Sequence, residues 1–328
     1  MRRSTLGGWV MGVWLTLQVG PAFSATLLFL ADRETPLFQS WLHDLRGYPH
    51  PPQHVVPSLR SAGAVLHGFL AVEGQGAPPR ARPPDSWATL CQRNRVQAVV
   101  AMGDEAARAA IRECPLPTLI VGITRLQVAP LLAATPRDSI SAIYLEADPA
   151  LNLQVLRALL PAARTVGIFV PPDGPTWLPS LRAEAQRLHF TLDEIAASAD
   201  LDAVRALRPR LPGLDAVLLP PEPALINEWS LKPLLLMTVR QGVPTFGGLT
   251  ARYVEAGVLA AVVADEERLP DQIQAVVAGL ARGRAPAPTY PTAVRVVVNP
   301  IVAQTLGLSA EAVDRARSLL PRSSSWLP

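Results

Sequence analysis

Polar and aromatic side chains follow several apolar runs of strand length in this sequence, at the points where short loops begin. Loops of this form start after residues 30, 102, 170, 219 and 246. Open α/β sheets bind ligands beyond the carboxyl ends of their strands, so these loops are the expected binding elements. The candidate ligand-binding residues are Arg33, Gly103, Asp104, Tyr144, Asp173, Trp177, Glu222, Asn227, Phe246 and Thr250.

Two of these loops offer opposite charges to a ligand. Arg33 can hold a carboxylate through two parallel hydrogen bonds, or it can belong to a solvated charged triplet at the start of a helix. The run Gly103-Asp104-Glu105 opens a helix, and helix N-termini normally attract anions. Asp104 is therefore either the N-cap of that helix or part of a site that prefers a cationic or amine group.

The other loops combine an aromatic ring, a carboxylate and glycines. Trp177 either stacks on a planar ligand or cation at the mouth of a cleft, or packs inside its own lobe. Glu222 is the carboxylate that we expect to contact an amine or hydroxyl group. Gly247 and Gly248 permit close approach of the backbone, and Tyr144 lies where the chain is expected to cross between lobes.

Signatures of enzyme chemistry are absent from the sequence. It contains no G-x-S-x-G elbow, no H-E-x-x-H, no P-loop and no complete G-x-G-x-x-G. Its five histidines show no metal-ligand spacing with cysteines or carboxylates. We therefore expect no catalytic residues, no metal and no cofactor, and a protein that is not an enzyme. An exported α/β hydrolase or oxidoreductase is the less favoured alternative.

The first 24 residues have the pattern of a signal peptide. Arg2 and Arg3 precede an apolar stretch, roughly residues 6–19, that is too short for a stable membrane span. Ala22 and Ser24 are small residues at the positions that signal peptidase accepts, which predicts cleavage after Ser24. An uncleaved N-terminal anchor helix is the alternative.

Composition restricts the partners of the mature chain. Removing the leader lowers the net charge from +3 to +1, which gives no electrostatic footprint for nucleic acid. No later segment reaches the roughly 18 uninterrupted apolar residues of a span, so the mature chain is expected not to cross a membrane. Cys91 and Cys114 form a disulfide in an oxidising compartment, or they are two small buried side chains.

Apolar runs and helix-like stretches alternate along the chain, which predicts an α/β fold with parallel strands buried on both faces. The expected strands are 26–30, 96–102, 118–123, 140–145, 166–170, 216–219, 243–246 and 259–263. The expected helices are 35–45, 85–93, 104–113, 149–160, 177–188, 200–208, 223–240 and 270–282.

Several of these segments carry short motifs in a characteristic order. They are VQAVVAMGDEAARAAI, NLQVLRALLPAARTVGIFVPP, LDAVLLPPEP, GVPTFGG followed by EAGVLAAVVAD, and VVVNPIVAQTLGL. In this order the chain resembles the ABC-transporter substrate-binding proteins of the tryptophan/tyrosine type, in the type I periplasmic binding protein superfamily. The likeness covers most of the mature chain and is strongest from residue 96 onward.

The resemblance implies two Rossmann-like lobes, each with a doubly wound parallel sheet, joined by three crossings. Lobe 1 would comprise residues 25–142 plus 259–284, and lobe 2 residues 143–258 plus 285–328 with a loose C-terminal tail. A ligand would lie between the lobes, and hinge bending would close them around it.

The function implied by the resemblance is that of a periplasmic receptor. It would close on a small polar or aromatic solute, amino-acid-like in character, and deliver it to the transmembrane subunits of an ABC permease. The receptor would be a monomer that binds no cofactor. A ligand-sensing or scaffolding protein of the envelope, without a transport role, is the alternative.

Overall fold

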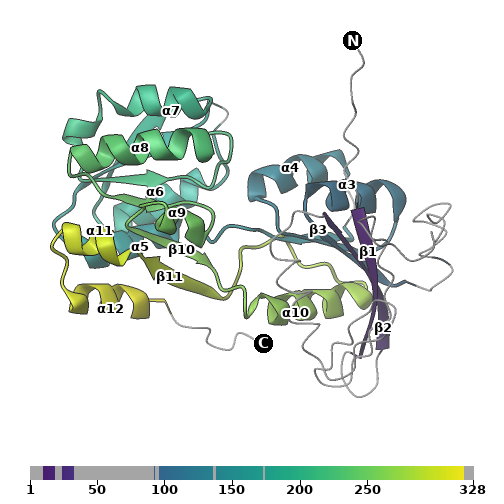
Figure 1. Cartoon of the computed structure of the whole chain (residues 1–328). Coiled ribbons are helices and arrows are strands. Elements are labelled where there is room, and N and C mark those ends of the chain that lie inside the picture. The colour runs from purple at the N-terminus through teal and green to yellow at the C-terminus, as the bar shows by residue number, and fades with distance from the viewer. Residues whose placement is uncertain are drawn as a thin grey trace, which may run out of the picture. The chain divides into compact units, whose positions relative to one another are not determined.

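The computed structural model describes residues 10–18, 24–32, 92, 96–135, 138–172 and 174–320 (Figure 1). The chain divides into two compact units, which are described separately. Unit 1 contains residues 1–144 and 270–289, and unit 2 contains residues 145–269 and 290–328. The backbone therefore passes between the units three times. Arg33, Cys91, Asp173 and the expected helix 35–45 lie outside the described residues, as does all of the expected helix 85–93 except Gln92.

Unit 1 is built on a five-stranded sheet with the order β1-β2-β3-β4-β5. Its strands are β1 (Val10–Gln18), β2 (Ser24–Asp32), β3 (Ala98–Met102), β4 (Thr118–Val121) and β5 (Ile140–Ile143). Strands β2 to β5 are parallel, and β1 pairs antiparallel with β2 at one edge. The helices assigned to this part of the chain are α3 (Asp104–Glu113), α4 (Arg125–Ala134) and α10 (Leu269–Ala281).

Unit 2 is built on a six-stranded sheet with the order β11-β10-β9-β8-β6-β7. Its strands are β6 (Thr165–Val170), β7 (Thr191–Ala196), β8 (Ala216–Leu219), β9 (Thr245–Gly247), β10 (Ala260–Ala264) and β11 (Val294–Val298). Its helices are α5 (Ala150–Leu159), α6 (Leu178–Arg187), α7 (Asp200–Leu207), α8 (Glu228–Arg240), α9 (Ala251–Glu255), α11 (Pro300–Thr305) and α12 (Ala310–Ser318), with a 3₁₀ turn at Leu211–Gly213. All neighbouring strands are parallel except β10 and β11.

The sheet of unit 2 is buried on both faces. Successive residues of a strand point to opposite faces, so Ile168 belongs to one apolar cluster and Phe169 to another. The cluster around Ile168 includes side chains of α5, α6 and α12, and the cluster around Phe169 includes side chains of α7 and α8. Helices therefore cover both faces of this sheet, and the predicted α/β fold with buried parallel strands is confirmed.

The division of the chain differs from the expected one at three boundaries. Residues 143–144 and 285–289 belong to unit 1, whereas we expected them in lobe 2, and residues 259–269 belong to unit 2, whereas we expected them in lobe 1. The reason for the last difference is strand pairing: β10 pairs with β11 along its whole length, from Ala260↔Val298 to Ala264↔Val294, and also touches β9 at Ala260↔Phe246. The antiparallel edge strands β1 and β11 also depart from the expectation of purely parallel sheets.

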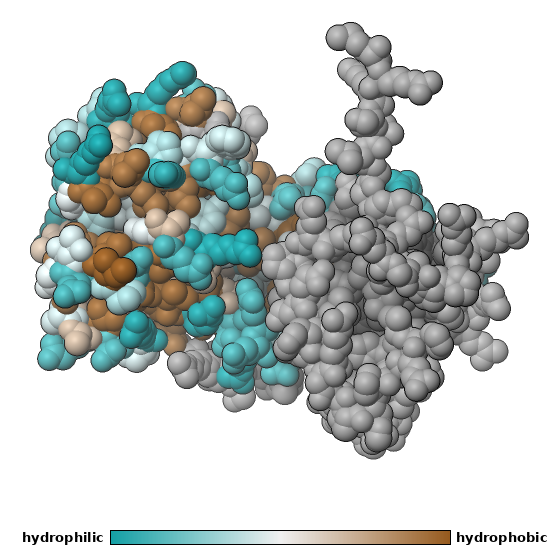
Figure 2. All heavy atoms as spheres, in the orientation of Figure 1, coloured by the Kyte–Doolittle hydropathy of each residue, from teal (hydrophilic) through white to brown (hydrophobic). Residues whose placement is uncertain are grey.

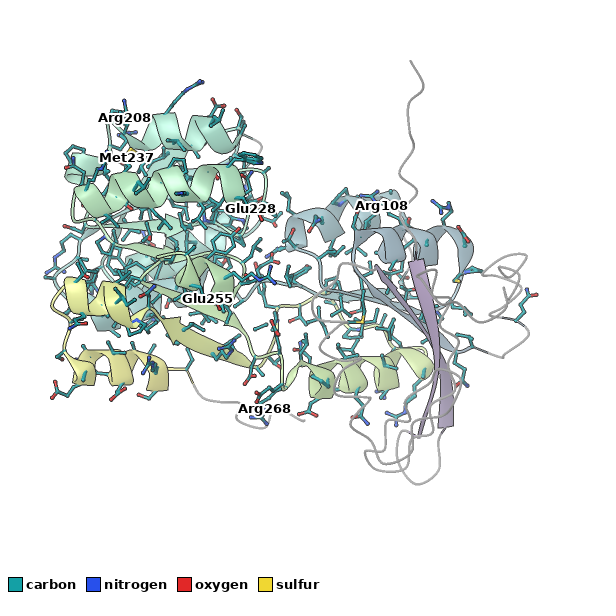
Figure 3. The ribbon with its side chains drawn as sticks, in the orientation of Figure 1. Arg108, Arg208, Glu228, Met237, Glu255 and Arg268 are labelled. Carbon is teal, nitrogen blue, oxygen red and sulfur yellow. The ribbon has the colours of Figure 1, made fainter. Side chains whose placement is uncertain are left out.

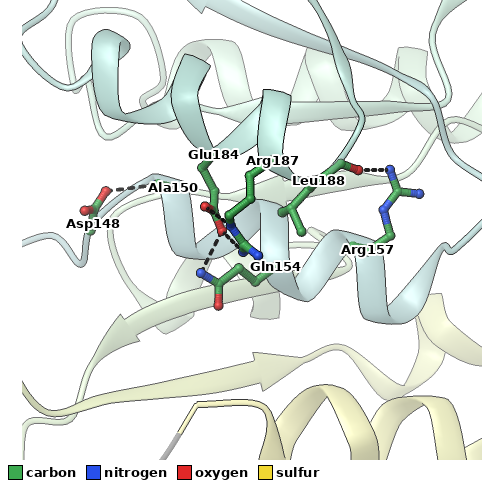
Figure 4. Close-up of polar contacts among 7 residues, drawn as sticks. All are labelled: Asp148, Ala150, Gln154, Arg157, Glu184, Arg187 and Leu188. Atoms are coloured by element: carbon green, nitrogen blue, oxygen red, sulfur yellow. Dashed lines mark hydrogen bonds and ion pairs between the residues drawn. The ribbon is translucent and has the colours of Figure 1, made fainter.

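Helices α5 and α6 of unit 2 are joined by polar contacts at their ends (Figure 4). Asp148 Oδ1 accepts a hydrogen bond from the Ala150 N–H at 3.0 Å, and Gln154 Nε2 donates to Glu184 Oε1 at 2.8 Å. Arg187 also pairs with Glu184 and is the main cause of the lowered pKa of that carboxyl. Of these contacts, the Gln154–Glu184 hydrogen bond joins α5 to α6, and the other two are local to the start of α5 and the end of α6.

Arg157 is the most highly connected side chain in this group. Its Nη1 donates to the carbonyl oxygens of Pro161 and Ala163 at 2.8 and 2.9 Å, and Nη2 donates to that of Leu188 at 2.7 Å. The guanidinium also lies 3.8 Å from the ring centroid of Phe190. The Arg157 guanidinium therefore links the C-terminal ends of α5 and α6 with the segments that lead into β6 and β7.

Replacing Arg157 by alanine is expected to lower the free energy of unfolding by about 2 kcal/mol, because it removes charge-assisted hydrogen bonds and a cation–π contact. Urea unfolding followed by circular dichroism measures the change. Arg205→Ala is the matched control, since Arg205 is 79% exposed and makes a long ion pair of 3.9 Å. Equal stabilities of the two variants would contradict this role for Arg157.

Candidate functional site

The strongest candidate site in unit 2 lies at the carboxyl ends of β6, β8 and β9. Strand β8 ends at Leu219 and leads through two buried prolines, residues 220 and 221, to Glu222. Proline has no N–H to donate, so this turn buries few polar backbone groups. The chain after β6 reaches Trp177 just before α6, and β9 leads to Gly248 and Thr250.

The structure brings two predicted residues, Trp177 and Glu222, into direct contact. Trp177 Nε1 donates a hydrogen bond of 3.0 Å to Glu222 Oε1, and both residues are only 3% exposed. The indole packs in the same apolar cluster as Leu178 and Phe246. In this conformation Trp177 packs inside its own unit, which is one of the two roles considered from the sequence.

Burial dominates the electrostatics of Glu222. Desolvation raises the pKa of this carboxyl above its ordinary value, although the hydrogen bond from Trp177 opposes the shift. No described residue donates a hydrogen bond to the second oxygen, Oε2. This oxygen is also not completely enclosed by the described chain. Glu222 therefore presents one oxygen that is fixed by an indole and a second that a ligand donor can use.

Glycines allow the backbone of β9 to approach β8 at this edge. Gly247 has φ +84°, and a Cβ atom there would lie 2.8 Å from the Leu219 carbonyl oxygen. Gly248, with φ +103°, donates its N–H to the same oxygen at 3.2 Å. Thr250 precedes α9 and is half-buried, and its hydroxyl makes no hydrogen bond to the described residues. Its hydroxyl is therefore a second polar group available at this edge.

Two other candidates have structural roles in unit 2. Asn227 caps α8: its Oδ1 accepts from the N–H groups of Trp229 and Ser230. Phe246 is completely buried and belongs to the apolar core. We assign these structural roles to Asn227 and Phe246 and leave both residues out of the proposed site.

In unit 1, the loop after β3 differs from the cap considered from the sequence. The N-cap of α3 is Gly103, with φ +101°, and Asp104 is the first helical residue. Asp104 Oδ2 accepts from Arg108 Nε at 2.8 Å, while Oδ1 is enclosed without a hydrogen bond. The carboxylate complements the helix dipole instead of capping it, because glycine occupies the cap position.

Tyr144 follows β5 at the point where the chain leaves unit 1. Its N–H donates to the Thr289 carbonyl oxygen at 2.9 Å, and the Arg125 guanidinium lies 5.8 Å from its ring centroid. Arg125 was missed from the sequence. A signal was present, because Thr124 and Gln127 form a capping box that starts α4 and so places Arg125 at its first turn.

Metal binding and membrane spanning were also considered for the residues in the described ranges. They contain no group of three or more His, Cys, Asp or Glu residues that could hold a metal ion, and no helix long and apolar enough to cross a bilayer. Cys114 is buried. Because Cys91 lies outside the described residues, the disulfide stays a prediction.

The raised pKa of Glu222 predicts how stability depends on pH. Below about pH 4.3, the ordinary value for glutamate, both the folded and unfolded states are protonated and the shift has no effect. As pH rises towards the folded-state pKa, the unfolded chain ionises more readily, so stability falls. Compared with Glu222→Gln, the wild type should lose unfolding free energy across this range.

Urea unfolding between pH 4 and 8 measures this difference. Glu255→Gln is the control, since Glu255 is an exposed carboxylate of the same unit (Figure 3). The change of the Glu222→Gln difference with pH is measured against that of Glu255→Gln. A wild type that gains stability over Glu222→Gln as pH rises would contradict the proposed desolvation.

Comparisons with known proteins identify the architecture. No family model matches the chain, and no curated protein matches its sequence. A conserved domain protein from Vibrio cholerae is similar, with a TM-score of 0.50 and 17% identity over 69% of this chain and 79% of that chain. An ABC domain from Streptococcus pneumonia in complex with L-Trp gives a TM-score of 0.51 and 19% identity over 70% of this chain and 83% of that chain.

A third solved structure is the ligand-free, open form of a substrate-binding protein with adhesive properties from Clostridium difficile. It gives a TM-score of 0.52 and 16% identity over 68% of this chain and 77% of that chain. Identities at this level establish the fold alone. Taken with the strand orders of the two sheets, they show that this chain has the type I periplasmic binding protein fold.

Proposed function

We propose that the protein is an exported solute-binding protein that captures a small, amino-acid-like solute with an amine group. The observation that carries the proposal is Glu222, a buried carboxylate at the carboxyl end of β8 with one oxygen held by Trp177. Buried carboxylates are costly unless they are paired, and a ligand ammonium group would supply the missing partner.

The neighbouring groups favour a polar contact for the same class of solute. The Trp177 N–H holds the carboxylate in place, and the Thr250 hydroxyl and the carbonyl oxygen of Gly248 can complete the polar contacts. The solved structure from Streptococcus pneumonia holds L-Trp, so L-tryptophan is the first solute to test, followed by other aromatic and polar amino acids.

The partner that we propose for the loaded protein is the transmembrane part of an ABC permease. Solute-binding proteins act by population shift: the solute stabilises one conformation, and a partner that recognises this conformation receives the solute. Arg33, Asp104, Tyr144 and Asp173 remain proposed contributors to binding. The protein is proposed to act in the periplasm as a non-enzymatic receptor, without a cofactor.

Removing the charge of Glu222 should weaken solute binding 10- to 100-fold, because one charge-assisted hydrogen bond is worth about 1.5–3 kcal/mol. Isothermal titration calorimetry with L-tryptophan and the amino-acid panel measures the affinities of wild type, Glu222→Gln and Trp177→Phe. Trp177→Phe keeps an aromatic ring but lacks the N–H that orients Glu222.

Glu255→Gln serves as the control and should bind like the wild type. If Glu222→Gln and Trp177→Phe both fold and retain full affinity, the assignment of the site is overturned. If the wild type binds no member of the panel, and no sugar or nucleoside, the ligand-free scaffolding role becomes the better interpretation.

Export predicts cleavage after Ser24. In the structure, β2 starts at this residue and β1 lies entirely in the segment that would be removed. Cleavage would remove only Ser24 from β2 and would leave the pairing of β2 with β3 unchanged. Mass spectrometry of protein from the periplasmic fraction of an expression host should therefore give Ala25 as the first residue. Replacing Ala22 and Ser24 by large residues should prevent processing, and a mature protein that still begins at Met1 would contradict the prediction.

A further inference from the structure

Helix α8 of unit 2 carries an apolar face that the described residues of its own unit leave exposed. Its inner side is anchored by Leu234, Leu235 and Thr238, which are buried. On the outer side Trp229 is 77% exposed, Leu236 52% and Val239 63%. Figure 2 shows hydrophobic surface in the region of α7 and α8.

These exposed side chains form a single strip. Positions 229, 236 and 239 are separated by seven and three residues, so they share one side of a helix with 3.6 residues per turn. The exposed residues Lys232 and Pro233 lie between them. We call this set of five residues, Trp229, Lys232, Pro233, Leu236 and Val239, the α8 face.

The two ends of the α8 face have opposite charge. Glu228 lies in the first turn of the helix and Arg240 in the last turn. Figure 3 shows Glu228 at one end of α8 and Met237 towards the other. Neither Glu228 nor Arg240 forms an ion pair with any described residue. Along the helix, an acid therefore comes first, then a mostly apolar centre that contains one cation, Lys232, and then a base.

A helix of this pattern is complementary to itself when reversed. In an antiparallel pair, Glu228 of one copy lies at the end that carries Arg240 of the other, and the apolar centres meet. The helix dipoles also oppose each other favourably. A two-fold axis requires this kind of self-complementary surface, on which each residue meets its counterpart reciprocally.

We propose that the α8 face is the interface of a homodimer, in which two copies of this chain pair α8 antiparallel about a two-fold axis near Leu234. This goes beyond the proposed solute-binding function and differs from the monomer implied by the family resemblance. A 13-residue helix is about 20 Å long, so its face alone is smaller than the roughly 800 Å² per partner of a standard interface. The dimer is therefore weak and depends on protein concentration.

Lys232 provides a specific probe, because it is the only lysine in the sequence. It lies two residues from the proposed axis, so the two Lys232 Cα atoms of a dimer are offset by about 6 Å along the helices. An amine-reactive suberate linker should join Lys232 to Lys232. In a mixture of unlabelled and ¹⁵N-labelled protein, mass spectrometry should find this link between a light and a heavy peptide. Lys232→Arg should abolish the link and preserve the dimer.

Sedimentation velocity over a range of protein concentrations measures dimerisation itself. Trp229→Ser and Leu236→Ser should each weaken the dimer at least tenfold. Ile301→Ser is the matched control, because Ile301 is 74% exposed on α11 of the same unit and should not affect dimerisation. Glu228→Arg and Arg240→Glu should each weaken the dimer, and the double variant should restore it by exchanging the charges.

A chain that remains monomeric at every concentration and gives no light–heavy Lys232 link overturns the proposal. So does a dimer that is insensitive to Trp229→Ser and Leu236→Ser, because its interface must then lie elsewhere. All variants are surface substitutions. Circular dichroism should first establish that each variant is folded, and only folded variants are compared.

Discussion

The burial of one carboxylate at the end of β8 constrains the surrounding part of unit 2. An ionised group in an apolar environment is expensive, and among the described residues one side-chain donor, the Trp177 indole, offsets the cost. The contact joins the turn before α6 to the loop after β8. The Glu222 carbonyl oxygen also accepts from the N–H groups of Leu225 and Ile226, which shapes the chain that leads into α8. Side chain and backbone of one residue thus position two helices.

This arrangement explains why a costly residue can be retained at the carboxyl edge of the sheet. A carboxylate that served only stability would be better replaced by an apolar side chain of similar size. A binding carboxylate has a different requirement, since it must be held in place while one oxygen stays available. The indole meets this requirement because it is a donor only and cannot turn to accept a hydrogen bond. Under the proposed function, this hydrogen bond holds Glu222 in one orientation for recognition of the solute.

The sequence predicted where individual strands and helices lie along the chain better than which strands pair with each other. The expected strand 216–219 and helix 104–113 agree with β8 and α3, because their apolar patterns are continuous and their ends carry clear signals. Strand β7 was missed because it is a half-exposed edge strand and lacks a continuous apolar run. Residues 259–269 were placed in the wrong unit because pairing depends on which strands meet in space, and an apolar run carries no information about its partner.

The same limit applies to the site. Trp177 and Glu222 were both identified from their positions after strands, but their hydrogen bond spans 45 residues and no local pattern encodes it. Asn227 was selected as a polar residue near a strand end, and only the backbone geometry shows that it caps α8. Its role is partly local, since Asn is a preferred N-cap, and a search for caps would have found it.

The segment from Glu222 to Arg240 links the two proposals physically. It begins with the carboxylate of the proposed solute site, passes through the Asn227 cap and continues into the helix that carries the α8 face. In the two proposals, the solute site and the α8 face therefore belong to one continuous segment. If a solute changes the dimerisation affinity by some factor, dimerisation must change the solute affinity by the same factor.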